Sequence, residues 1–271
     1  MTDRERLAAF LRQQTKQANA WNAQRRASVS QVESILRETE ARVLRQLKNA
    51  PTDWQLHHLP KVQKAIADAL TEMEREMAAA MAEQTQLAVS MGQATISGPL
   101  AAAGISLDLA PIISTRQVAA TRFFQTDLIQ GVAKRGLNKI NMQMGLVISG
   151  AQTTTQAIDA VSLILQGDRG RAMTVVRTEV ARAYGAASQE AKVEYRRFLP
   201  GLKKQWHMSG KLHPRRTHQA VHLQIRDVDK PFDVGGEELM YPRDPKGSAK
   251  NTVNCGCESY SYMERWDVNT A

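Results

Sequence analysis

Cysteine is scarce in this sequence of 271 residues, which contains only Cys255 and Cys257. A bond across so short a spacing would be strained, and two cysteines cannot form a network of disulfides, so a disulfide scaffold is excluded. We therefore expect a chain that folds in a reducing compartment. Aromatic residues make up only 5%, whereas the 42% hydrophobic and 23% charged residues are ordinary for a globular protein. This composition argues against wholesale disorder, and the abundance of Ala, Gln, Met and Arg favours helix.

Long apolar runs are also missing. No stretch of about 18 consecutive apolar residues occurs, so we expect no membrane-spanning helix and no membrane partner. Residues 1–10 are charged and have no apolar centre, so they do not resemble a signal peptide. The net charge is +9, from 36 basic and 27 acidic residues. A basic balance of this size favours an acidic partner such as nucleic acid.

The first part of the chain has helical periodicity. Residues 1–27 are polar and basic, and their pattern fits both a helix and an arm that is frayed or bound to a partner. From Ser30, which begins a capping-box pattern, to just before Pro51 we expect a first helix. A second helix of more than thirty residues is expected from Pro60 towards Met91, and its methionine-rich apolar stripe is interpreted as packing against another helix.

Glycine and proline divide the remainder into expected segments. We expect a tight connection over residues 99–111, a helix from about Thr115 to Gly150 that breaks near Gly136, and a short helix capped by Thr153 or Thr154 and stopped by Gly167. A further helix is expected over 169–197, followed by short strands and turns over 202–262. The sequence therefore predicts an α+β protein. Its three parts are a polar basic arm (1–27), a helical domain with long helices (28–166) and a small α+β module (167–271).

The strongest local charge lies in residues 192–216. Eight Lys and Arg residues stand there against the single acid Glu194, with Tyr195, Phe198 and Trp206 between them. Cations interleaved with aromatic rings are typical of sequence-tolerant nucleic-acid binding. The alternative is a solvated helix end, where cations are favoured electrostatically. The candidate nucleic-acid-binding residues are Lys192, Arg196, Arg197, Lys203, Lys204, Lys211, Arg215 and Arg216.

Histidine and cysteine form a second candidate site. His218 and His222 are four residues apart, which would place both on one face of a helix, and the thiolates of Cys255 and Cys257 would complete a tetrahedral zinc set. His213 is a possible substitute ligand. The alternative is a pair of ordinary thiols in a small β core with histidines on a polar loop. A catalytic zinc would also need an open coordination position and a general base such as Glu237 or Glu238, and nothing in the spacing selects either.

A series of short motifs runs in a definite order through the last third of the chain. The series comprises Arg177-Thr178-Glu179-Val180, Lys204-Gln205-Trp206, Ser209, Arg216, His218, Asp229-Lys230-Pro231-Phe232, Val234-Gly235-Gly236, Leu239, Tyr241-Pro242-Arg243-Asp244-Pro245 and Val253-Asn254-Cys255-Gly256-Cys257. In order and spacing it resembles the phage Mu F-like head morphogenesis family, the phage minor head proteins, although Gly256 stands where that family usually has arginine. We interpret six of these residues as a fold signature with scaffold roles: Arg177, Glu179, Trp206, Gly235, Gly236 and Asn254.

The resemblance implies a component of the virion head, at the capsid interior or portal vertex, made in the bacterial host cytoplasm. It implies a non-enzymatic role in head assembly and in DNA packaging or delivery. The implied partners are the portal protein, the major capsid or scaffolding protein, double-stranded DNA and possible further copies of the chain. The alternative is an enzyme or effector, a zinc-dependent hydrolase or nuclease built on the His/Cys cluster. A DNA-binding module without a role in the head is a third hypothesis.

Overall fold

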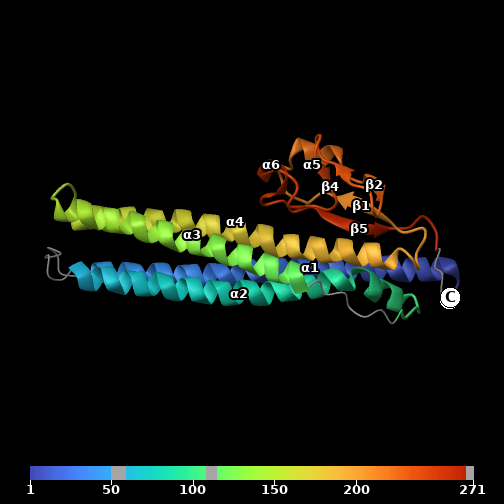
Figure 1. The fold of residues 1–271 in the computed structure, drawn as a ribbon, viewed down its shortest axis with the longest axis horizontal. Coiled ribbons are helices and arrows are strands. Elements are labelled where there is room, and N and C mark those ends of the chain that lie inside the picture. The colour runs from blue at the N-terminus through green and yellow to red at the C-terminus, as the bar shows by residue number, and fades with distance from the viewer. Residues whose placement is uncertain (50–58, 108–114, 267–271) are drawn as a thin grey trace. The chain divides into compact units, whose positions relative to one another are not determined.

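Four long helices make up most of the chain. The computed structural model describes residues 1–49, 59–107 and 115–266, and its helices are α1 (Asp3–Lys48), α2 (Leu59–Ala102), α3 (Thr115–Ile148) and α4 (Thr154–Tyr195) (Figure 1). Shorter elements follow α4. The predicted α+β class, with long helices before a small module of short strands, is confirmed. Among the described residues, no helix has the length and apolar content needed to cross a membrane.

The C-terminal module contains two small antiparallel sheets. Its elements are β1 (Lys203–His207), α5 (Arg216–Ala220), β2 (Ile225–Asp227), β3 (Phe232–Asp233), β4 (Glu238–Leu239), α6 (Ala249–Thr252) and β5 (Glu258–Tyr262). The larger sheet has the order β2-β1-β5, and β3 pairs with β4. Side chains alternate along β1, so Lys204 and Trp206 are buried while their neighbours are half-buried. Opposite Lys204, the register places Arg226 on β2 and Ser261 on β5.

The helices are longer than the sequence predicted. Ser30 lies inside α1, which already begins at Asp3, so residues 3–27 are helical. Gly136 and Gly167 lie inside α3 and α4 and do not interrupt them. A helical glycine costs only about 1 kcal/mol, and packing of the helix can outweigh that cost. The expected domain boundaries after residues 27 and 166 therefore fall within continuous helices, while Pro51 and Pro111 lie outside the described residues.

The beginning of α4 was predicted correctly. Thr153 and Gln156 form the reciprocal bonds of a capping box: the Thr153 amide donates to Gln156 Oε1 at 2.8 Å, and the Gln156 amide donates to Thr153 Oγ1 at 3.2 Å. This cap satisfies backbone donors that a helix leaves free at its start.

The chain divides into two compact units, and each is built from segments that are distant in sequence. Unit 1 contains residues 1–26, 84–121 and 177–271, and unit 2 contains residues 27–83 and 122–176. Each of the four long helices contributes to both units. Neither unit is a continuous stretch of chain, which the sequence did not indicate.

Unit 2 is entirely helical and has an apolar interior. The expected methionine stripe is buried, with Met73, Met77 and Met81 at most 5% exposed, so it packs as predicted. Arg169 on α4 forms an ion pair of 2.6 Å with Glu40 on α1, beside this interior. Both side chains are largely withdrawn from solvent, so the pair fixes how the two helices align within the unit.

Unit 1 holds two apolar clusters. The first joins the helices to the chain that leaves α4, and its members are Phe10, Ile96, Leu100, Ala103, Ile105, Ala191, Tyr195, Leu199, Leu202, Val228 and Met263. The second is the core of the C-terminal module and consists of Trp206, Val221, Phe232, Val234, Leu239, Cys255 and Cys257. The two cysteines are therefore part of a packed interior.

Helices α1, α2 and α4 approach one another closely within unit 1. The Trp21 ring stacks on the Tyr184 ring with 4.1 Å between centroids and an interplanar angle of 4°. At Gly92 a Cβ atom would lie 2.6 Å from the Tyr184 carbonyl oxygen and 2.8 Å from Ala187 Cβ. Only glycine allows the α2 and α4 backbones to come this close.

We expect Gly92→Ala to destabilise the protein by about 1–3 kcal/mol, because the new methyl group would meet backbone atoms that cannot rotate away. Gly145→Ala on α3 is the matched control, since nothing lies within 4 Å of its added Cβ. That substitution should stabilise by up to about 1 kcal/mol through helix propensity. Urea unfolding of both variants tests the pair. Equal effects at the two positions would contradict the close approach of α2 to α4.

Candidate functional site

One histidine and two cysteines meet in the core of the C-terminal module. His218 lies on α5, and Cys255 and Cys257 lie in the segment between α6 and β5. His218 Nδ1 is 3.3 Å from Cys257 Sγ and 3.6 Å from Cys255 Sγ, and the three ligand atoms lie within 4.8 Å of one another. The residues are 3%, 5% and 2% exposed in chain order. We call them the His/Cys/Cys group, and their chemistry is that of a site that could hold a metal ion.

The backbone around the two cysteines is tightly constrained. Asn254 adopts a φ of 53°, a left-handed conformation that asparagine tolerates better than most residues. Its amide donates to Thr178 Oγ1 on α4 at 2.9 Å. A Cβ at Gly256 would lie 2.8 Å from Ser209 Cβ, so a bulky side chain does not fit there without movement. The Cys257 amide donates to Cys255 Sγ at 3.4 Å, which turns both thiols to the same side.

Arg243 supports this segment from inside the module. Its Nη1 donates to the carbonyl oxygens of Cys255 at 2.9 Å and Cys257 at 2.8 Å, and its Nη2 donates to both Glu258 carboxylate oxygens at 3.0 Å. Glu258 also accepts a bond of 3.0 Å from Trp21 Nε1 on α1. These bonds connect the cysteine segment to β5 and α1.

Sequence reasoning assigned no role to Arg243 or Glu258. Arg243 was part of the motif series but was given no role there, and Glu258 was not among the candidate residues. A charge that must be neutralised inside the module has no local sequence pattern, because the partner is found only once the chain has folded. An acid directly after the second cysteine was the only available signal.

Charge and hydrogen bonding separate the two thiols. The Cys257 thiol donates to Cys255, and together with His218 and Arg243 this lowers the pKa of Cys255. The pKa of Cys257 is raised, because it is the donor in this bond and because it is buried. The arrangement therefore favours a thiolate at Cys255, the form in which cysteine binds a metal.

His222 is not part of the group, contrary to the expected four-ligand set. Helix α5 ends at Ala220, so the four-residue helical spacing from His218 does not apply at His222. His222 instead accepts the Met208 amide at its Nδ1, at 3.2 Å, and its ring lies 6.0 Å from that of His207. His213 is also outside the group, and Glu237 binds Ser248. The expected set is thus reduced to three residues.

Two lysines of the basic stretch are buried, so their assignment to nucleic-acid contact is wrong. Lys192 is 1% exposed and donates to Ser188 Oγ at 2.6 Å and to the Ser259 carbonyl at 3.1 Å. Lys204 is 0% exposed and donates to the Met240 carbonyl at 2.7 Å. Both lie on faces that the periodicity of α4 and β1 turns inward, and backbone acceptors from distant segments satisfy them.

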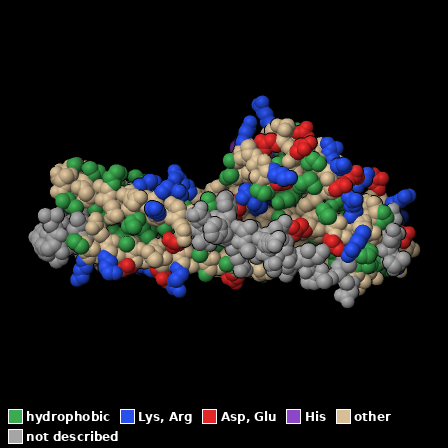
Figure 2. Space-filling view, in the orientation of Figure 1, with side chains coloured by type: hydrophobic (Ala, Val, Ile, Leu, Met, Phe, Trp, Pro, Cys, Tyr) green, Lys and Arg blue, Asp and Glu red, His purple; other side chains and the backbone are tan. Residues whose placement is uncertain are grey.

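Four other cations of the stretch are engaged within the protein. Arg196 pairs with Asp229 at 2.8 Å, and Arg197 pairs with Glu194 at 2.5 Å. Lys211 donates to the Asn254 carbonyl, and Arg215 donates to the Val253 carbonyl at 2.6 Å. Only Lys203 and Arg216 remain without such a contact among the described residues. On the face of the C-terminal module that Figure 2 shows, basic and acidic side chains are intermixed.

The residues interpreted as a fold signature occupy structural positions. Glu179 pairs with Arg182 on the same helix at 2.7 Å, and Arg182 Nε donates to the Arg243 carbonyl at 3.0 Å. Burial raises the pKa of Glu179 despite this partner. Arg177 has no ion pair among the described residues, so its scaffold role stays a prediction.

The other signature residues shape the module. Trp206 is fully buried in its core. Gly235 and Gly236 have φ values of 66° and 85° and form the turn before β4, a conformation that favours glycine.

Comparisons with known proteins give two partial relatives. The chain is 37% identical over 119 residues to the uncharacterized protein YqbB of Bacillus subtilis (strain 168), covering 41% of the chain and 38% of that protein. It is 31% identical over 94 residues to the NAD(+)--arginine ADP-ribosyltransferase EFV of Enterococcus faecalis (strain ATCC 700802 / V583), covering 35% of the chain and 19% of that protein. The matches therefore span about two fifths and one fifth of these relatives. No family model and no solved structure matches the chain.

The buried lysine of α4 should make stability depend on pH. Burial and the charge of Lys204, partly offset by Glu258, lower the pKa of Lys192 from 10.5 to about 7. The unfolded chain then binds more protons than the folded protein between these values, so the free energy of unfolding should rise as pH increases through that window, by at most ~1.4 kcal/mol per pH unit. Urea unfolding from neutral pH upward measures the slope.

Lys192→Met should remove part of that slope, whereas Lys250→Met, at an exposed position, should leave it unchanged. A slope that is the same in the wild type and both variants would show that Lys192 keeps its proton in the folded protein.

Proposed function

We propose that this chain is a minor head protein of a tailed bacteriophage, which acts in head assembly and in DNA packaging or delivery by binding the portal or inner capsid and DNA. The observation that carries the proposal is where the motif series lies. Thr178 contacts Asn254, Glu179 pairs with Arg182, and Arg182 reaches Arg243. Two of these contacts attach the small module to α4, and they involve the motifs around Thr178, Arg243 and Asn254. Such a role favours a structural and interaction protein over an enzyme.

Several exposed apolar side chains in a nearly uncharged part of unit 2 support docking on another protein. Between Lys139 and Asp168 the only charged residue is Asp159. Leu163 on α4 is 69% exposed and Met142 on α3 is 58% exposed, and Leu146 and Ile148 are also exposed. Uncharged surface with several exposed apolar side chains is typical of protein interfaces. The proposed occupant is the portal or the inner capsid surface.

Particle composition tests the head proposal directly. Mass spectrometry of purified procapsids and mature particles from the phage or prophage that encodes the chain should detect it in a constant ratio to the portal protein. Leu163→Ser should reduce that ratio several-fold, whereas Leu212→Ser, at another exposed leucine, should not. Absence of the wild-type chain from both kinds of particle would rule the proposal out.

The His/Cys/Cys group favours zinc as a structural cofactor of the module. Two thiols and one imidazole nitrogen are the side chains that zinc prefers, and three of them converge here within 4.8 Å. All three are buried, which suits a structural ion better than a hydrolytic one, because a substrate must reach a catalytic metal. Without His222, the structural assignment and the alternative of a zinc-dependent hydrolase or nuclease have the same three ligands, and burial is the observation that separates them.

Metal analysis of the purified full chain tests the zinc assignment. We expect close to one zinc per chain, and a Co²⁺-substituted protein should show thiolate-to-metal charge-transfer absorption. His218→Ala and Cys257→Ser should each lower the bound metal several-fold, while His222→Ala should retain it. A chelator should lower the thermal midpoint of the wild type, since metal binding to the folded state stabilises that state. Full metal retention in Cys257→Ser, or equal loss in His222→Ala, would contradict this site.

The transferase named in the comparison does not enter this proposal. The shared segment covers 19% of the enterococcal protein, so the activity in its name can belong to the other four fifths. An assay for arginine ADP-ribosylation on the full chain would reveal such an activity here.

A further inference from the structure

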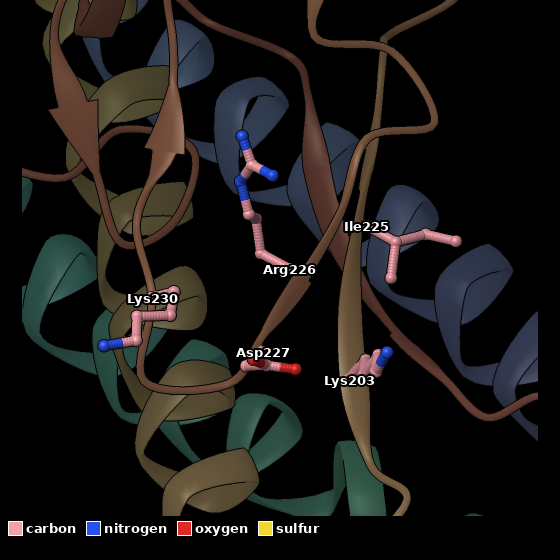
Figure 3. Close-up of a pocket in the computed structure, with 5 residues that line it drawn as sticks. All are labelled: Lys203, Ile225, Arg226, Asp227 and Lys230. Atoms are coloured by element: carbon pink, nitrogen blue, oxygen red, sulfur yellow. The ribbon is translucent and has the colours of Figure 1, made fainter.

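A surface hollow lies at the edge of the larger sheet in the C-terminal module. Its volume is about 390 Å³, and it is lined by Lys203 on β1, by Ile225, Arg226 and Asp227 on β2, and by Lys230 in the turn that follows (Figure 3). Strand β2 pairs only with β1 among the described residues, so its outer edge is open. Of these residues, only Lys203 was a candidate in the sequence. Arg226 and Lys230 lie beyond the end of the basic stretch.

The charge of this hollow is only partly neutralised within the protein, by Asp227, which lies directly opposite Lys203 in the strand register. Three cations line it together with one carboxylate, Asp227. In the described part of the chain, none of the three cations belongs to an ion pair, whereas nearby Arg196 is paired with Asp229. A hollow that keeps a net positive charge attracts anions, and it does so with side chains that require no rearrangement of existing pairs.

The cations are spread around the strand and do not converge on one point. Side chains alternate along a strand, so Arg226 leaves β2 on the opposite face from Asp227. Figure 3 shows the Arg226 guanidinium and the Lys230 amino group pointing in different directions, with Lys203 on the neighbouring strand. A small anion would contact one of these groups at a time. An extended chain of phosphates can contact all three.

We propose that this hollow, with Lys203, Arg226 and Lys230, is the contact site for the phosphates of a nucleic-acid backbone, with double-stranded DNA as the ligand. The inference rests on the DNA-binding part of the proposed function and replaces the basic stretch with a surface of defined residues. Lysine and arginine contacts to phosphates provide affinity without reading the base sequence. Binding at the hollow should therefore depend strongly on salt and little on DNA sequence.

Duplex-DNA binding by the full chain over a range of salt concentrations tests the hollow. The test variant carries Lys203→Gln, Arg226→Gln and Lys230→Gln. The matched control carries Arg37→Gln, Lys64→Gln and Arg75→Gln, three exposed cations of unit 2 that pair within their own helices. Both variants lose the same net charge. Thermal unfolding verifies that each remains folded. Inorganic phosphate, compared with chloride at equal ionic strength, serves as the competitor.

The test variant should bind DNA roughly tenfold more weakly than the wild type. The slope of the logarithm of its binding constant against the logarithm of salt concentration should become shallower by about 0.9 for each lost phosphate contact. The control should keep the wild-type slope. Phosphate should compete no better than chloride. Equal losses of affinity in both variants, unchanged affinity in the test variant, specific competition by phosphate, or no DNA binding by the wild type would each overturn the proposal. Absence of DNA binding by the wild type would also remove DNA from the proposed function, whereas the other three results overturn the hollow alone. None of the four depends on whether the chain is present in virions, which tests the head proposal separately.

Discussion

The C-terminal module depends on one buried guanidinium, that of Arg243. A fully buried charge is tolerated only when it is paired and hydrogen-bonded, because desolvation costs several kcal/mol per ion. Glu258 supplies the opposite charge, and the carbonyls of both cysteines take two further bonds. Glu258 in turn receives the Trp21 indole from α1. The positions of the thiols, of β5 and of the first helix are thus set by the same requirement, which is to satisfy this charge inside the module.

Much of the fold could be predicted because helical periodicity is a local property. The spacing of apolar residues identified the long helices and the buried methionine stripe, and the residue type at Thr153 indicated the cap. The ends of the helices could not be predicted as well. Glycine often ends a helix, but Gly136 and Gly167 lie inside α3 and α4. Whether a helix continues past a glycine is decided by packing along the whole helix. The division into two discontinuous units also escaped prediction, since it depends on which segments of four helices meet.

The candidate sites show the same limit more sharply. The sequence grouped His218 with both cysteines because their chemistry is shared, but it added His222 on the assumption of a helix that ends too early. The charge run between residues 192 and 216 looked like a surface, although Lys192 and Lys204 find acceptors far along the chain. The sequence gives the number of cations. Only the folded structure shows which cations are already paired, and among the described residues Arg226 and Lys230 belong to no ion pair.

The discontinuity of unit 1 has a consequence for synthesis on the ribosome. The contacts of Trp21 with Glu258 and of Gln14 with the Ser261 carbonyl join residues 237 and 247 positions apart. The first helix therefore emerges from the ribosome long before β5, which supplies its partners in these contacts. Before β5 has been made, the Trp21 indole lacks its Glu258 acceptor and the Gln14 side chain lacks the Ser261 carbonyl. Chains that stop before β5 would leave these two donors of the first helix without their acceptors, so the first helix acquires its full set of partners only when translation has passed β5.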